Sequence, residues 1–112
     1  MASSAGSETV QELQMLEQQR QQLLMQKQTF QVEQNQVQNA LNEVKATSDS
    51  VFKVISGALI KVEKQKMLSE LEDKLKTLSM RIDSIEKQEK SIDDRMDSLQ
   101  KELRNIIAKE KK

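Results

Sequence analysis

Two long stretches of this sequence repeat apolar residues at alternating spacings of three and four. In the first stretch, from Leu13 to Val44, seven of the ten stripe positions are apolar. In the second, from Leu68 to Ile106, eleven of the twelve are apolar and Glu89 is the exception. A mean period of about 3.5 residues keeps one stripe of a helix facing a partner helix through a left-handed supercoil. We therefore predict two coiled-coil helices, each roughly 60 to 70 Å long at about 1.5 Å per residue.

The segment between the two stripes has a different pattern. Residues 51–62 are β-branched and apolar on both sides of Ser56-Gly57, which predicts a β-hairpin with a two-residue loop. If the cross-strand pairing of the hairpin continues into the two helices, their apolar stripes face each other. The predicted fold class is mainly α, a long antiparallel two-helix coiled coil with one central β-hairpin. The predicted cross-strand pairs, whose residue numbers sum to 113, are Ile55 with Ala58, Val54 with Leu59 and Val51 with Val62.

Four segments follow from these patterns. Residues 1–7 are small, polar and without periodicity, so they are predicted to be a disordered leader. The first coiled-coil helix is assigned to residues 8–48, because Thr9 and Glu12 have the spacing of a capping box. The β-hairpin takes residues 51–62, and the second coiled-coil helix takes residues 63–110.

Composition narrows the possible functions. There is no Cys and no His, and 18 basic side chains balance 18 acidic ones. Thiolate chemistry is therefore excluded, and the commonest metal ligand is missing. We predict no enzyme activity, no cofactor, no metal and no attraction to nucleic acid or a membrane surface. The first residues lack the features of a signal peptide, so a cytoplasmic location is expected.

The hairpin is the strongest candidate for an oligomerisation site. Two strands alone are marginal in water, and this pair is apolar on both faces with two unpaired edges. We expect hairpins from several chains to pair edge to edge in an intersubunit β-barrel. The alternative is that the hairpin packs only on its own helices. The predicted oligomerisation residues are Val51, Phe52, Val54, Ile55, Gly57, Ala58, Leu59, Ile60 and Val62.

The open end of the coiled coil is the second candidate surface. More apolar side chains occur there than one seam can bury, and flexible Met suits a surface that adapts to many partners. Single exposed apolar residues are also common on ordinary helices, so both interpretations stay open. The residues of this tip set are Val10, Leu13, Met15, Leu16, Leu103, Ile106 and Ile107.

Polar residues interrupt the stripes at a few positions. Arg20, Lys27 and Gln34 lie on the first stripe and Glu89 on the second. The register places Lys27 within reach of Glu89, so either an ion pair in the seam or two charged groups that extend to solvent is expected. The Gln-rich run at residues 18–22 is interpreted as a solvated helix face.

Residues 11–109 resemble the beta-class subunit of prefoldin, a cytosolic chaperone of archaea and eukaryotes. The hairpin run FKVISGALI is similar to the family's aromatic-Lys-x-x-Gly-x-x-Leu-Ile pattern. The run LEDKLKTL after the hairpin and the later KQE are also similar, the latter to the family's Arg-Gln-Glu. Phe52 replaces the more frequent Tyr, and Ser56 fits the pattern loosely.

The resemblance implies a hetero-hexamer of two alpha-class and four beta-class subunits. In such proteins the hairpins form a β-barrel platform, and the coiled-coil tips hold non-native polypeptides and transfer them to a group II chaperonin without ATP. On this sequence, residues 51–62 would belong to the platform and the tip set would bind the polypeptide. The alternative function is a structural coiled-coil adaptor that dimerises through its stripe.

Overall fold

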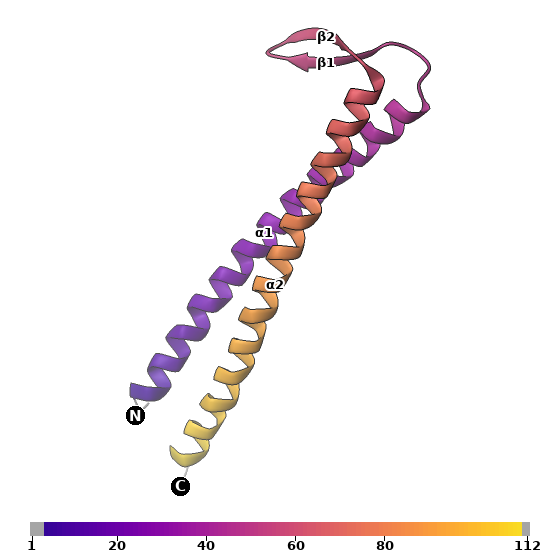
Figure 1. The fold of residues 1–112 in the computed structure, drawn as a ribbon. Coiled ribbons are helices and arrows are strands. Elements are labelled where there is room, and N and C mark those ends of the chain that lie inside the picture. The colour runs from indigo at the N-terminus through magenta and orange to yellow at the C-terminus, as the bar shows by residue number, and fades with distance from the viewer. Residues whose placement is uncertain (1–3, 111–112) are drawn as a thin grey trace. The chain divides into compact units, whose positions relative to one another are not determined.

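The computed structural model describes residues 4–110 as two helices joined by a two-stranded antiparallel sheet (Figure 1). The order is α1 (Ser4–Ala46), β1 (Val51–Ile55), β2 (Ala58–Val62) and α2 (Lys64–Glu110). The predicted mainly α fold with one central hairpin is therefore confirmed. Neither helix, within the described residues, has an apolar stretch that could cross a membrane.

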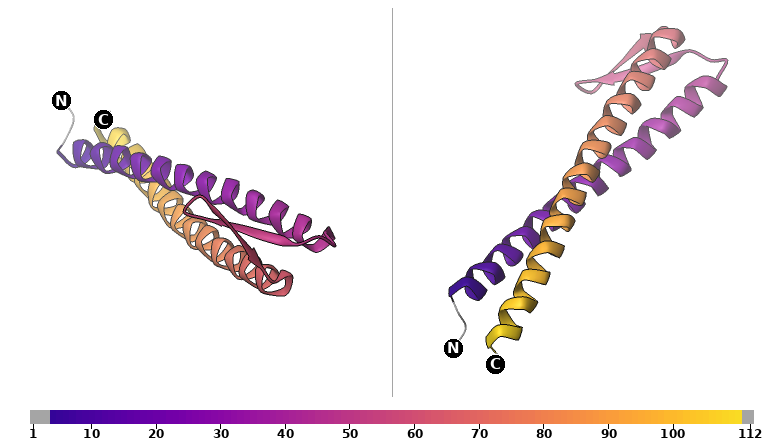
Figure 2. Two further views of the ribbon diagram at one scale, coloured as in Figure 1. Left: turned by 90° about the horizontal axis from the view of Figure 1, so that it is seen from above. Right: turned by 60° about the horizontal axis from the view of Figure 1, so that its bottom comes forward.

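The chain divides into two compact units, to which both helices contribute. The end unit contains the described residues up to Lys27 and those from Ser84 onward, that is, the first part of α1 and the last part of α2 (Figure 1). The hairpin unit contains Gln28–Asp83, with the strands between the end of α1 and the start of α2 (Figure 2). In each unit, a segment of α1 packs antiparallel to a segment of α2.

Helix α1 begins earlier than its sequence indicates. Residues 4–7 are helical, so the predicted leader is wrong for these residues, while residues 1–3 lie outside the described part. Thr9 does not cap the helix, because its hydroxyl donates a hydrogen bond to the Ala5 carbonyl one turn earlier (2.8 Å). Gly6 and Thr9 are both buried. Packing of this first turn therefore outweighs the low helix propensity of its Gly and Ser residues.

The other end of α1 is capped from α2. The helix ends at Ala46, two residues before the predicted 48, and α2 begins at Lys64 rather than at 63. The Lys64 ammonium donates hydrogen bonds to the carbonyls of Lys45 (3.2 Å) and Thr47 (2.9 Å). The last carbonyls of a helix have no partner within it and carry partial negative charge, so a cation here stabilises the helix end.

The hairpin has the predicted register. Its five cross-strand pairs run from Val51 with Val62 to Ile55 with Ala58. Ser56 and Gly57 have φ values of 49° and 80°. Positive φ at both loop positions is the geometry of the tight turn whose twist matches that of paired strands.

The buried apolar side chains follow the two stripes. In the end unit they are Ile85 and Leu99, and Leu99 is only 1% exposed. In the hairpin unit, four stripe residues and one strand residue are buried. They are Val37, Leu41, Leu78, Ile82 and Val51.

Replacing Gly57 by Ala is expected to destabilise the hairpin by about 1 kcal/mol, because a side chain disfavours the left-handed backbone conformation. No atom lies within 4 Å of the Cβ that would be added, so the cost comes from the backbone rather than from a clash. Thermal unfolding followed by circular dichroism measures the effect. Ser56→Asn is the matched control, since Asn adopts positive φ readily and should maintain or raise the Tm. Equal losses from both variants would contradict this account of the turn.

Candidate functional site

One face of the hairpin is apolar and open to solvent. Phe52, Val54 and Leu59 lie on this face and are 54%, 67% and 72% exposed. Val54 and Leu59 are direct cross-strand partners, so their side chains are neighbours. Burying each of these side chains would contribute roughly 1.5 to 3 kcal/mol. A second surface that covers this face would therefore be strongly favoured.

The opposite face of the hairpin is partly covered by the chain's own helices. Val51 is buried and Val62 half-buried. The Lys53 ammonium lies 3.1 Å from the Glu70 carboxylate of α2, which ties β1 to that helix. Ile55 and Ile60 remain 47% and 43% exposed. Packing on its own helices thus accounts for only part of the apolar surface of the hairpin.

An apolar hollow follows β1. Its volume is about 370 Å³, and it lies between the strand and the nearby turns of both helices. Its apolar lining residues are Ala40, Val44, Val51, Phe52, Val54, Met67 and Leu71.

The tip set divides into exposed and seam residues within the end unit. Val10, Met15 and Ile107 are 40%, 53% and 44% exposed. The other four residues are half-buried, as expected for members of the stripes. They are Leu13, Leu16, Leu103 and Ile106.

The polar residues on the first stripe all have partners on α2. The Lys27 ammonium lies 2.7 Å from the Glu89 carboxylate, and their side chains are only 20% and 16% exposed. The seam ion pair, one of the two alternatives that the sequence left open, is therefore formed. The other two pairs are Arg20 with Asp93 at 2.9 Å and Gln34 with Ser79 at 3.0 Å.

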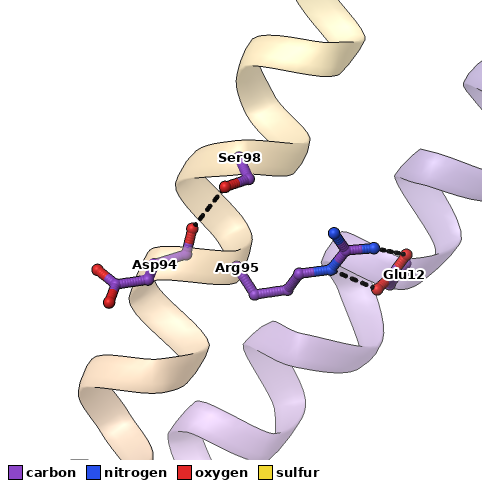
Figure 3. A network of polar contacts seen from close by, with 4 residues as sticks. All are labelled: Glu12, Asp94, Arg95 and Ser98. Atoms are coloured by element: carbon purple, nitrogen blue, oxygen red, sulfur yellow. Dashed lines mark hydrogen bonds and ion pairs between the residues drawn. The ribbon is translucent and has the colours of Figure 1, made fainter.

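A further ion pair joins the helices beside the tip set, and sequence reasoning did not find it. Arg95 of α2 donates from Nε and Nη2 to the two carboxylate oxygens of Glu12 on α1, at 3.0 and 3.2 Å (Figure 3). These hydrogen bonds and the charge of Glu12 raise the pKa of Arg95. The capping-box pattern had assigned Glu12 to a local role. On α2 itself, the Ser98 hydroxyl donates to the Asp94 carbonyl (3.1 Å).

The described residues expose apolar surface on the hairpin and in the end unit. Among residues 4–110, no group of acidic side chains is arranged to hold a metal ion. The apolar surfaces that the described residues expose include the hairpin face and part of the tip set. The fold is that of an antiparallel two-helix coiled coil with one central β-hairpin.

Comparison with known proteins identifies the family. Residues 7–110 match the family model described as prefoldin subunit. The prefoldin beta subunit of Pyrococcus abyssi is 35% identical over 80 residues, covering 70% of this chain and 68% of the relative. That of Methanosarcina acetivorans is 36% identical with the same coverage.

Solved structures agree in fold. The crystal structure of the prefoldin beta subunit from Thermococcus strain KS-1 superposes with a TM-score of 0.89, at 26% identity and 94% coverage of both chains. The beta2 subunit from the same strain has a TM-score of 0.70 at 15% identity, which supports the fold alone, and covers 80% of this chain and 97% of that chain. This chain belongs to the prefoldin subunit family, with its relatives among the beta subunits. The resemblance seen in the sequence is confirmed, and with it a chaperone role.

Replacing Glu89 by Ala is expected to lower the free energy of unfolding by about 1 to 3 kcal/mol, because Lys27 would remain largely buried without its partner. Chemical denaturation measures the change. The control is the double variant K27L/E89L, which removes both charges and should recover most of the loss. A double variant no more stable than Glu89→Ala would show that apolar packing cannot replace the ion pair.

Proposed function

We propose that this chain is an ATP-independent holding chaperone subunit, which assembles through its hairpin and binds non-native polypeptides at its tip set. The observation that carries the proposal is the exposed apolar face of Phe52, Val54 and Leu59 on a sheet with two unpaired edges. Such a sheet is completed by strands from other chains, because pairing closes the edges and covers the apolar face together.

The proposed assembly is a hetero-hexamer with two alpha-class subunits and four copies of this beta-class chain. Family membership supports it, as does a hairpin whose own helices leave most of its apolar side chains exposed. The hollow along β1 adds apolar surface that a neighbouring subunit would bury.

The tip set is the proposed polypeptide-binding surface. Val10, Met15 and Ile107 provide exposed apolar side chains in the end unit, toward the start of α1 and the end of α2. Unfolded chains expose apolar residues without a fixed shape, and Met adapts its conformation to different partners.

We further propose transfer of the bound polypeptide to a group II chaperonin in the cytoplasm. The chain has only two Gly, at positions 6 and 57, and so lacks a phosphate-binding P-loop.

The double variant V54K/L59K is expected to prevent assembly, because two ammonium groups would have to be buried in the shared barrel. Native mass measurement with an alpha-class partner tests this. The control Q31K/N35K adds the same charge at exposed positions of α1 in the same unit and should assemble normally. Normal assembly of V54K/L59K would exclude the hairpin as the interface and favour a coiled-coil adaptor.

The triple variant V10S/M15S/I107S is expected to weaken suppression of client aggregation several-fold while the assembly keeps its mass, since only exposed apolar groups are removed. Light scattering of a chemically unfolded enzyme diluted into buffer measures the activity. L24S/V32S/M80S, which changes three exposed apolar residues elsewhere, should retain it. Equal activity of the two variants would reject the tip assignment.

A further inference from the structure

A hollow lined by glutamine side chains lies on one flank of the end unit. Its volume is about 170 Å³, and the half-buried stripe residues Leu23 and Ile92 contribute to its lining. The other lining residues are all exposed glutamines, three from α1 and one from α2. We call these four residues the amide flank: Gln19, Gln22, Gln26 and Gln88.

The amide flank is uncharged over several helical turns. On α2, Ser84 and Ser91 lie one turn before and one turn after Gln88 and are also exposed. Toward the start of α1 and the end of α2, the next charged residues on the same helix faces are Glu12 and Arg95, whose charges are paired with each other. Exposed charges occur on the same α2 segment: Lys87 borders the flank, one turn from both Ser84 and Ser91, and the others are Glu86, Lys90, Asp93, Asp94 and Asp97. On α1, no charged residue occurs between Arg20 and Lys27, where Gln22 and Gln26 lie.

An uncharged amide surface suits a particular kind of ligand. Each Gln side chain carries two hydrogen-bond donors and one acceptor, which complement the C=O and N–H groups of a peptide backbone. Neutral amides lose water at lower cost than ammonium or carboxylate groups do. Backbone hydrogen bonds do not depend on the side chains of the ligand, so binding of this kind tolerates many sequences. Leu23 and Ile92 add apolar contact at the same place.

The amide flank is also continuous with the tip set. Met15, which is 53% exposed, lies four residues before Gln19 and therefore on the same face of α1. A polypeptide held at Met15 would meet Gln19, Gln22 and Gln26 as it extended along the helix.

We propose that the amide flank is a second binding strip, which takes extended polypeptide segments poor in charged residues that lead away from the tip. This inference rests on the proposed function and adds a residue-level site to it. The tip set would hold apolar side chains of the client, and the amide flank would bind its backbone.

Site-specific crosslinking tests the contact directly. The chain has no Cys, so Gln22→Cys accepts a single benzophenone label. Gln21→Cys is the matched control, because it is also exposed but turned away from the hollow by one helical position. The probe is an unfolded fluorescent peptide of Ser, Asn, Gly and Leu, added to the assembled complex. Crosslinks to the peptide are expected from position 22 and few from position 21. Equal yields, or crosslinks from position 22 only to another subunit, would overturn the inference.

Binding affinity provides the second measurement. Q19E/Q22E/Q26E retains side-chain size but places charge on the strip, and is expected to weaken peptide binding about five- to tenfold by fluorescence anisotropy. The control Q14E/Q21E/Q28E adds the same charge at exposed positions away from the hollow and should change the Kd less than twofold. Equal effects of the two variants would overturn the amide flank while leaving the tip assignment intact. Failure of the unmodified complex to bind the peptide or to suppress aggregation would instead reject the proposed function.

Discussion

The register between the two helices is the constraint on which the other features of the structure depend. A two-residue turn allows one alignment of β1 with β2, and a shift by one residue would move every strand side chain to the other face. In the hairpin, the residue numbers of each cross-strand pair sum to 113. Residues that pair between the helices follow nearly the same rule, as for Gln34 with Ser79 and Lys27 with Glu89. The same alignment determines which apolar side chains are buried and which remain exposed.

Polar residues in the seam reinforce this register at some cost in stability. An apolar pair at positions 27 and 89 would pack in many alignments, whereas an ion pair that is four-fifths buried is satisfied in one. Arg20 and Asp93 are about half exposed, so their pairing contributes less to stability. In a protein with many exposed apolar side chains, a specific alignment limits the number of wrong pairings between helices.

Periodicity and turn chemistry were sufficient to predict the helices, the hairpin and its register, because these depend on residues close in sequence. The ion pair between Lys27 and Glu89 was predictable only as one of two outcomes, since a stripe does not show whether a long side chain turns inward. The start of α1 was predicted wrongly because Gly6 and Thr9 are buried in the folded chain, and a local capping pattern does not include burial. The Glu12–Arg95 pair was missed for the same reason. The hollow beside Gln22 requires the relative rotation of two helices, which a heptad pattern leaves approximate.

The tight turn also has a consequence for the order in which the chain folds. Contacts near Ser56 and Gly57 close short loops, which costs little conformational entropy. Once these contacts have formed, each further turn of paired helix adds only a small entropic cost, because its residues are already held near one another. Folding can therefore proceed like a zipper from the hairpin, whereas starting from Glu12 and Arg95 would require closing a loop of 83 residues at once. On the reverse path, the helix segments farthest in sequence from the turn separate first, so the surface around Glu12 and Arg95 opens with the least loss of packing.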